Sequence, residues 1–475
     1  MEEKLSVCLL NDSFPPLIDG VANTVMNYAA NINKNHGSAA VAVPYYPGAD
    51  DSGYDYKIIR YPSINTEKIL NYRAGYPFMP KTVDEVKEEN INIIHTHCPF
   101  ASTFLARVLR GAIDAPVVFT YHTKFDVDIA RAVNNKFLQE KVIHQMVKNI
   151  EACDEVWVVS EGAGENLKSL GYKGEYVVMQ NGVDIPKGRV SDELIAEAAK
   201  SYDIPENVPV FLFVGRMAWY KGLDTILEAL EKLDEKEKDF RMVFIGGGLD
   251  IEEVKNYAKE LGIDEKCIFT GPIHNRETIR AWYCRADLFL FPSVYDTNGL
   301  VVREAAACGL ASLLIKGSCA AEGITDGETG FLCENNAESF SERLFEILKT
   351  PEIMKKTGQN AMDKIYISWE DSVAKAAERY KTVLENYRAG KYKKDESFTE
   401  DWLRTEGELL DGINRARHYR KHIHEEIKDY GKEMYHGSVR AAESFKNRSI
   451  RLKNKTKEKK DEMKKAILEK LDRYL

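Results

Sequence analysis

The stretch FPSVYDTNGLVVREAAACG, from Phe291 to Gly309, joins an expected strand to an expected helix. The residues DLFLF lead into it as a short apolar run that ends at the turn signal PS, which is typical of a buried strand. Asp296 and Glu304 therefore follow the carboxyl end of a strand. Ligands bind at that edge of open α/β sheets, and acceptor-only side chains there suit a hydroxyl-rich ligand such as a sugar or ribose. An ordinary loop Asp and a first-turn Glu favoured by the helix dipole are the alternative.

Apolar, β-rich runs alternate with helical patterns on both sides of this stretch, which predicts βαβ units and largely parallel sheets. In the first half the runs are KLSVCLL, AAVAV, INIIHTH, PVVFTYH, EVWVVS and EYVVM, with helical stretches at 22–33, 102–110 and 136–152. After NGVDIP, at 181–186, a second series begins: PVFLFVG, RMVFIGG, CIFTG, DLFLFPS and ASLLI. The expected fold class is therefore α/β with two doubly wound, Rossmann-like domains.

The charge of the chain is unevenly distributed. The formal net charge of the 475 residues is -9. The segment 438–475 nevertheless carries 13 Lys and Arg against 6 Asp and Glu. An acidic body with a basic tail indicates an anionic partner at the tail, and the body gives no reason to expect nucleic-acid binding.

Cysteine usage and apolar runs indicate a cytosolic protein. The 8 cysteines have no CxxC spacing, so we expect buried small hydrophobes in a reducing compartment and neither a disulfide framework nor metal ligands. The N-terminal MEEKLSVCLLND has no basic region, and its apolar run is too short for a signal peptide. No apolar run approaches the roughly 18 residues that a membrane span needs.

These segments resemble the family 4 retaining nucleotide-sugar glycosyltransferases. The acidic signature of that family is Glu, seven residues, Glu, and then a small-residue helix that ends in Gly; Glu304 matches the second acid, and Asp296 stands in place of the first. The segment YDTNGL is more similar to diacylglycerol glucosyltransferases than to the usual E-x-F-G-L of the family.

The resemblance covers roughly residues 4–388 and implies a GT-B arrangement, in which two domains face each other across a cleft. It implies an acceptor-side N-terminal domain at 1–185, completed by a helix at 369–388, and a nucleotide-sugar-binding domain at 186–368. Residues 389–475 are expected to form a helical extension outside the family core, with a heptad seam from Leu409 to Met434 and a basic end. This extension suits an anionic membrane surface, a homo-oligomer or a solvated charged helix.

The pairs Gly215-Arg216 and Lys221-Gly222 resemble the diphosphate grip of the family. Arg supplies a fork of donors and Lys a compact charge, so together they can stabilise a leaving nucleoside diphosphate without a metal. A surface Arg and Lys that flank a helix start are the alternative. The resemblance further implies that Glu304 holds the ribose and Asp296 a hydroxyl of the donor sugar. The remaining residues expected near the nucleotide sugar are Gly20, Gly247, Pro272, Ile273, Gly299 and Leu300.

Two histidines end apolar strands in the first half, His97 in IIHTH and His122 in VVFTYH. The resemblance makes His122 the candidate for a polar contact to the donor, whereas we expect His97 to be a satisfied histidine at a strand end. No third and fourth ligand falls at zinc-binding intervals. Asp126 and Asp128 match the DxD metal signature of the other large glycosyltransferase fold, but three-residue matches occur by chance, so we expect a solvated or acceptor-side pair.

The expected function is transfer of a hexose from a nucleotide diphosphate sugar, UDP-linked, to a lipid, lipid-linked or other glycan acceptor. The resemblance implies retention without a cofactor or metal, because the leaving phosphate assists acceptor attack and the enzyme supplies position and charge. The protein would work in the cytoplasm, peripherally at the inner face of the plasma membrane. The alternatives are a sugar phosphorylase or nucleotide-sugar epimerase of the same architecture, and a non-catalytic scaffold that uses the helical extension.

Overall fold

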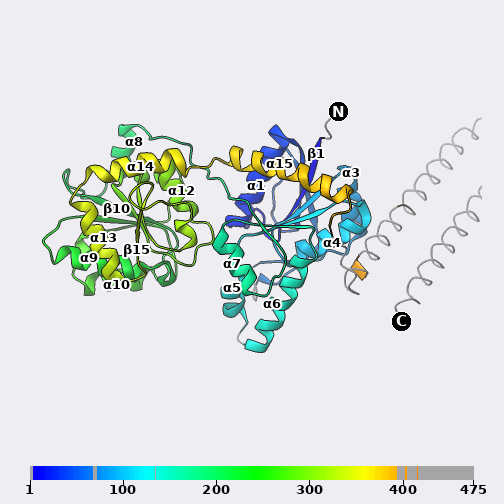
Figure 1. The fold of residues 1–475 in the computed structure, drawn as a ribbon, viewed down its shortest axis with the longest axis horizontal. Helices are drawn as coiled ribbons and strands as arrows, with labels where there is room; N and C mark the ends of the chain where they lie inside the picture. Colours follow the sequence, from blue (N-terminus) through cyan, green and yellow to red (C-terminus); the bar gives the residue numbers. More distant parts are fainter. Residues whose placement is uncertain (1–3, 68–71, 134, 393–401, 404–414, 416–475) are drawn as a thin grey trace, which may run out of the picture.

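A computed structural model of the chain describes residues 4–67, 72–133, 135–392, 402–403 and 415. Within them, two parallel sheets lie in separate α/β units along the long axis (Figure 1). We call them the N-terminal unit and the C-terminal unit. The α/β fold class expected from the alternating runs is confirmed.

The sheet of the N-terminal unit has seven described strands in the order β3-β2-β1-β6-β7-β8-β9, and all its pairs are parallel. The strands are β1 Leu5–Leu10, β2 Gly37–Pro44, β3 Lys57–Tyr61, β6 Ile93–Thr96, β7 Val117–Tyr121, β8 Glu155–Val158 and β9 Val177–Val178. A short antiparallel pair, β4 (Ser63–Ile64) and β5 (Ala74–Gly75), follows β3. The helices are α1 Gly20–Asn35, α3 Pro80–Glu88, α4 Ala101–Ile113, α5 Phe125–Ala132, α6 Lys136–Glu151 and α7 Glu161–Ser169.

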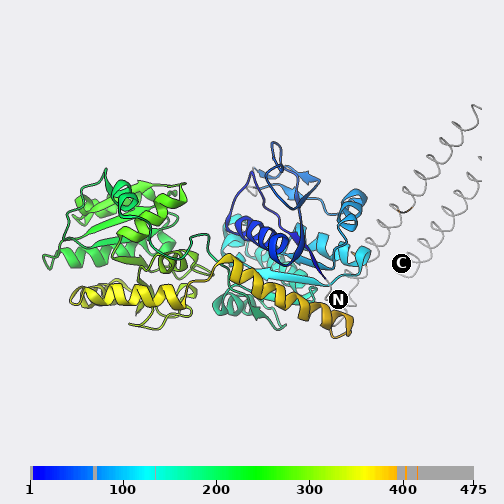
Figure 2. The same cartoon turned by 90° about the horizontal axis from the view of Figure 1, so that it is seen from above.

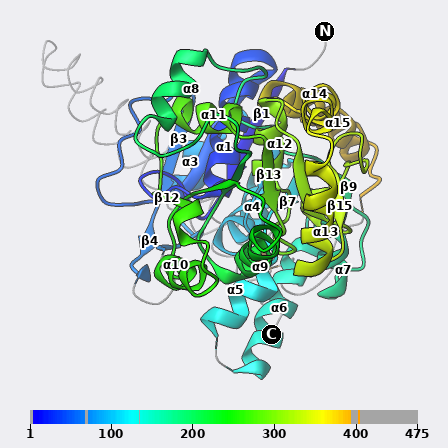
Figure 3. The ribbon, with the colours of Figure 1, turned by 90° about the vertical axis from the view of Figure 1, so that its left-hand side faces the viewer.

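The sheet of the C-terminal unit has six described strands in the order β12-β11-β10-β13-β14-β15, again all parallel. They are β10 Val210–Val214, β11 Arg241–Ile245, β12 Cys267–Gly271, β13 Leu288–Phe291, β14 Ser312–Ile315 and β15 Phe331–Cys333. The helices are α8 Asp192–Ala199, α9 Leu223–Asp234, α10 Ile251–Glu260, α11 Arg276–Arg285, α12 Leu300–Ala307, α13 Ala337–Leu348 and α14 Glu352–Lys364, with the short 3-10 turns η1 Trp219–Lys221 and η3 Cys319–Ala321. Viewed end-on, this unit lies in front of the N-terminal unit (Figure 3).

The helix α15 (Trp369–Arg388) leaves the C-terminal unit and runs along the N-terminal unit (Figure 2). Its apolar face carries Val373, Ala377 and Tyr380, which are buried in one core with residues of β1 and α1. Arg379 forms a two-bond ion pair with Glu155 at 2.8 and 2.7 Å. The last helix of the described core therefore packs on the N-terminal unit.

Of the C-terminal extension, the structure describes residues 389–392, 402–403 and 415. Leu403 is fully buried beside α3 and α4, and Trp402 lies edge-on against Phe78. The heptad seam and the basic segment 438–475 lie outside the described residues. No helix in the described part of the chain is both long and apolar enough to cross a bilayer.

The packing of α15 makes a testable contribution to the stability of the N-terminal unit. Leu384→Ala deletes buried methyl groups from the shared core and should lower the free energy of unfolding by about 2–3 kcal/mol. The measurement is urea denaturation followed by circular dichroism. Lys375→Ala, on the exposed side of the same helix, should change it by less than about 0.5 kcal/mol. Equal effects of the two substitutions would contradict the packing of α15.

Candidate functional site

The site begins at the carboxyl ends of the adjacent strands β10 and β13. Lys221 ends η1 after β10, and Asp296 lies in the loop after β13, so the sheet brings them together. Lys221 Nζ is 2.7 Å from Asp296 Oδ1, and both side chains are mostly buried. Asp296 Oδ2 is buried and has no hydrogen-bond partner among the described residues. A cation and an acid with one free acceptor oxygen therefore share one edge of the sheet.

Gly222 allows the close approach of these two loops. Its φ is +76°, and a Cβ there would lie 2.9 Å from Pro292 Cγ. Arg216, in the loop after β10, is exposed and donates to Tyr220 Oη at 3.3 Å. The positive charges expected from the sequence thus lie in the same loop, with Lys221 fixed by Asp296 and Arg216 exposed to solvent.

The loop that carries Arg216 packs against the glycines after β11. A Cβ on Gly246 would lie 1.9 Å from the carbonyl oxygen of Gly215, and one on Gly248 would lie 2.1 Å from that of Met217. The backbone N–H of Met217 donates to the carbonyl oxygen of Gly247 at 2.9 Å. We expected Gly247 to lie near the nucleotide sugar; at its neighbours Gly246 and Gly248 the approaching backbone is the protein's own. Gly247 itself is open except toward Pro272, after β12, at 3.7 Å.

Glu304 lies on α12 and is 8% exposed. Its Oε2 accepts a hydrogen bond from Tyr283 at 3.0 Å, and its Oε1 accepts one from Arg276 at 3.3 Å. Arg276 also pairs with Asp184 at 2.8 Å. Burial raises the pKa of Glu304 above its usual range, although the charge of Arg276 and the Tyr283 hydrogen bond oppose the shift. The sequence reasoning missed Arg276 and Tyr283; their spacing of two helical turns on α11 was the available signal.

Gly299 fixes the geometry between Asp296 and Glu304. Its φ is +58°, and a Cβ there would lie 2.7 Å from the Cα of Ala320 in η3. Any other residue would be strained and would push α12 away from η3. Leu300 follows as the first residue of α12.

The loop after β13 also touches the N-terminal unit. Thr297 Oγ1 donates to the backbone oxygen of His122 at 2.6 Å, and Ser160 Oγ donates to the backbone oxygen of Thr297. Close by, Glu322 accepts from the backbone N–H groups of Glu161 and Gly162 at 2.7 and 2.6 Å at the start of α7. These contacts bring His122 next to the loop that carries Asp296.

The two histidines at the ends of β6 and β7 form a buried pair. His97 Nδ1 and His122 Nε2 are 2.9 Å apart, and the rings are stacked. Burial lowers the pKa of His122 to about 3, and burial together with neighbouring histidines lowers that of His97 well below its usual range. Both rings are therefore neutral at pH 7, so His122 can hydrogen-bond to a ligand but is not a protonated acid. We expected His97 to be satisfied, yet its Nε2 is buried without a partner among the described residues.

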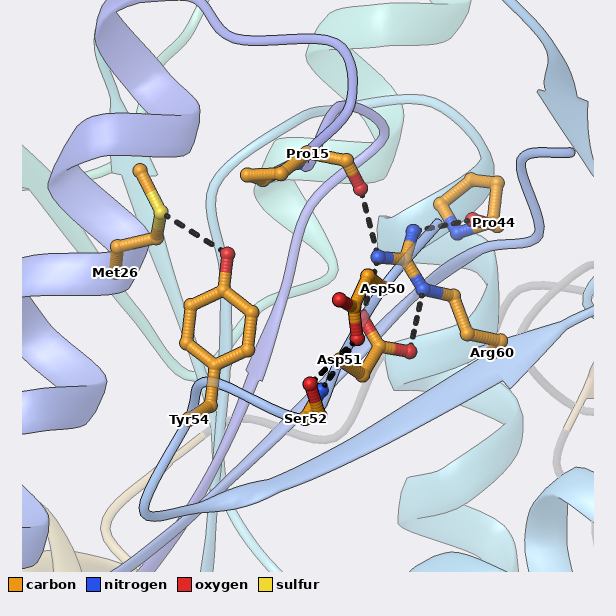
Figure 4. Close-up of polar contacts among 8 residues, drawn as sticks. All are labelled: Pro15, Met26, Pro44, Asp50, Asp51, Ser52, Tyr54 and Arg60. Atoms are coloured by element: carbon orange, nitrogen blue, oxygen red, sulfur yellow. Dashed lines mark hydrogen bonds and ion pairs between the residues drawn. The ribbon is translucent and has the colours of Figure 1, made fainter. Parts of the chain in front are cut away.

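We expected Gly20, in the first loop of the N-terminal unit, to lie near the nucleotide sugar, and the structure differs from this expectation. Gly20 begins α1 as expected, but Asp19 Oδ1 already accepts the backbone N–H groups of Val21 and Ala22 at 2.9 and 2.8 Å. Those donors are therefore not free for a phosphate while Asp19 caps the helix. The loop is held by Arg60, which bonds to the backbone oxygen of Pro15 at 2.7 Å and to both oxygens of Asp51 (Figure 4).

The acidic pair after β7 is described at the side chain of Asp126 alone. Asp126 lies on α5, and its Oδ1 is 3.5 Å from Asn166 Nδ2. The side chain of Asp128 lies outside the described structure. No group of His, Cys, Asp and Glu suited to a metal is found among the described residues. All 8 cysteines are free thiols, five of them buried, as expected.

Comparison with protein families decides the class. The model for Glycosyltransferase Family 4 matches residues 18–187, and the model for Glycosyl transferases group 1 matches residues 195–364. The chain belongs to glycosyltransferase family 4. It is an enzyme that transfers glycosyl groups, and its two α/β units correspond to the two matched segments.

Relatives and solved structures agree with this assignment. An alpha-monoglucosyldiacylglycerol synthase of Streptococcus pneumoniae is 25% identical over 310 residues, which are 64% of this chain and 70% of that protein. A protein of the same name from Acholeplasma laidlawii is 23% identical over 75% of this chain and 92% of its own. The structure of HepE from Anabaena with UDP superposes with a TM-score of 0.64 at 16% identity, over 80% of this chain and all of that one. The GT-B fold of the glycosyltransferase is thereby shown.

In this glycosyltransferase, Lys221, Asp296 and the Thr297 contact to His122 lie at one place between the two units. Glu304 joins Arg276 and Tyr283 on the same sheet edge, whereas Arg216 makes no contact with the acids. Thr297 and Glu322 also shape the site and were missed, because their roles depend on contacts between units that no local pattern records.

The buried state of Glu304 makes the stability of the enzyme depend on pH. Because its folded-state pKa lies above the ordinary value of 4.5, the Glu304 contribution to stability is present below that value and is lost as pH rises through the raised pKa. Glu304→Gln, measured without nucleotide, should raise the melting temperature by about 2 °C or more near neutral pH, and the gain should shrink toward acid pH. The measurement is differential scanning fluorimetry across pH. Glu260→Gln, exposed on α10, is the control and should show no such trend. A Glu304→Gln melting temperature that falls further below wild type as pH rises would contradict the burial argument.

Proposed function

We propose that this enzyme transfers a hexose from a UDP-linked sugar to a lipid or lipid-linked acceptor with retention of the anomeric configuration. The observation that carries the proposal is the contact of Lys221 with Asp296 at 2.7 Å. A diphosphate needs a cation, and a sugar hydroxyl needs an acceptor such as the free Asp296 Oδ2. A cation and an acceptor oxygen side by side support the binding of one nucleotide-sugar molecule.

The reaction breaks the bond between the anomeric carbon and the diphosphate oxygen. Negative charge then grows on the departing diphosphate, and Arg216 and Lys221 lie where they can stabilise it. The acceptor hydroxyl forms the new bond on the same face and gives its proton to the departing phosphate oxygen. Glu304 would hold the ribose, with Arg276 and Tyr283 fixing its carboxylate, and neutral His122 would bond to the sugar.

The names of the relatives support the lipid acceptor and the nucleotide. Two of them are named alpha-monoglucosyldiacylglycerol synthases, and a similar solved structure is HepE in complex with UDP-glucose. The basic segment 438–475, outside the described residues, is consistent with an anionic membrane surface where such an acceptor would be found. A cytoplasmic enzyme peripheral to the membrane is part of the proposal.

Replacement of Arg216 tests the charge that the reaction needs. Arg216→Ala should lower the rate of donor consumption by roughly a hundredfold to a thousandfold, the usual effect of removing one transition-state contact. Arg216→Lys keeps the charge but loses the fork of donors, so its loss should be intermediate. The measurement is release of nucleoside diphosphate from a panel of nucleotide sugars, with and without diacylglycerol vesicles. Wild-type rates in a folded Arg216→Ala enzyme would remove Arg216 from the site.

Chelation tests whether protein cations replace a metal. Turnover should persist within about twofold in excess EDTA, because Arg216 and Lys221 supply the positive charge. The same assay with added manganese and magnesium gives the comparison. Activity that disappears in EDTA and returns with either metal would contradict the proposal.

A further inference from the structure

Asn298 is a buried amide that has no hydrogen-bond partner. It lies between Asp296 and Gly299 in the loop after β13 and is 7% exposed. Neither its Oδ1 nor its Nδ2 has a hydrogen-bond partner among the described residues. Burying an amide without partners is unfavourable, so such groups in folded proteins call for an explanation.

The unpaired polar atoms near Asn298 gather at one edge of the sheet. Ser293 follows β13, Ser318 follows the neighbouring strand β14, and the hydroxyl of each is buried without a partner in the described structure. Asp296 Oδ2 is a further such atom. Lys221, which is paired with Asp296 Oδ1, lies at the same edge of the sheet. Because the carboxyl ends of neighbouring parallel strands meet at one sheet edge, these unused donors and acceptors share that edge with Lys221, which suits a ligand with several hydroxyls.

The backbone on both sides of Asn298 is fixed. Thr297 is bonded through its hydroxyl to the backbone oxygen of His122 and through its own backbone oxygen to Ser160. Gly299, in the left-handed conformation, is wedged against Ala320. The backbone that carries the amide is therefore held in place before a ligand arrives, which favours a selective contact.

We infer that Asn298 is a specificity-determining residue whose amide forms hydrogen bonds with two hydroxyls of the donor sugar. Asp296 Oδ2 accepts a hydrogen bond from a neighbouring hydroxyl of the same sugar. A carboxamide offers one acceptor and two donor hydrogens, and adjacent hydroxyls can donate and accept in turn. Asn298 stands where E-x-F-G-L of the family has Phe, which could not make these bonds. This inference rests on the proposed function and extends it: the donor is a sugar with free ring hydroxyls, and loss of one hydroxyl leaves a buried amide unpaired.

The first experiment uses the wild-type enzyme alone. UDP-glucose is compared with deoxy analogues in which one ring hydroxyl at a time is replaced by hydrogen. At least one analogue should lose about a hundredfold or more in kcat/KM, because a site built to bond a hydroxyl rejects the analogue that lacks it. Analogues that are all used within about threefold of the parent would overturn the inference. A wild-type enzyme that neither binds nor consumes any nucleotide sugar would instead refute the proposed function itself.

The second experiment replaces the amide. Asn298→Leu has a similar size without polar atoms, so the ligand-free melting temperature should rise by about 2–4 °C. Discrimination against the deoxy analogue should fall to about tenfold or less, while the Kd for free UDP should stay within about threefold. The control is Asn207→Leu on the exposed loop before β10. This variant should keep the wild-type discrimination against the deoxy analogue and the wild-type Kd for free UDP. Unchanged discrimination in Asn298→Leu would overturn the inference.

A smaller substitution controls for misfolding of the Asn298→Leu variant. Asn298→Ser keeps one hydroxyl in the same place and should retain UDP binding with an intermediate loss of discrimination. If both variants lose UDP binding and melt below wild type, Asn298 is a structural residue and the inference is wrong.

Discussion

The hydrogen bond from Thr297 to the backbone oxygen of His122 is the contact on which the arrangement of the site depends. It joins the loop after β13 of one sheet to the end of β7 of the other at 2.6 Å. Ser160 Oγ also donates to the backbone oxygen of Thr297, and Glu322 is bound to the start of α7, so several contacts hold the two units together at this place. The same loop holds Asp296 against Lys221, so one loop makes both the contact between the units and the ion pair at the sheet edge.

The charged side chains of the site differ in their partners and in their exposure to solvent. Lys221 is paired with Asp296, Glu304 is buried with Arg276 and Tyr283, and Arg216 is exposed to solvent. The neutral histidines add no charge where the sugar would lie. Arg276 also binds Asp184 in the segment between the units, and Asp184 is bonded to Asn27 of α1. The carboxylate expected at the ribose is therefore linked to the N-terminal unit by a second route.

Much of the fold was predictable, because its central strands are continuous apolar runs. The runs KLSVCLL and PVFLFVG became β1 and β10, which are buried on both faces. The strands β3 and β15 were missed, since KIIRY mixes charged and apolar residues and FLC is only three residues long. The strand order cannot be found from local patterns, because β1 lies between β2 and β6 through crossovers. At the site, the spacing of Asp296 and Glu304 located the sheet edge, whereas the partners Arg276, Tyr283 and Thr297 are set by tertiary contacts.

The configuration of the sugar in the product tests the central claim, that positioned protein charges let the acceptor attack on the face from which the diphosphate leaves. The measurement is proton NMR of the anomeric signal while the enzyme consumes UDP-glucose, an α-linked donor, in the presence of diacylglycerol vesicles. Same-face attack predicts that the first glycolipid formed carries an α linkage. A β-linked first product would contradict it, because inversion requires attack from the opposite face and a group in the protein to take the proton of the acceptor.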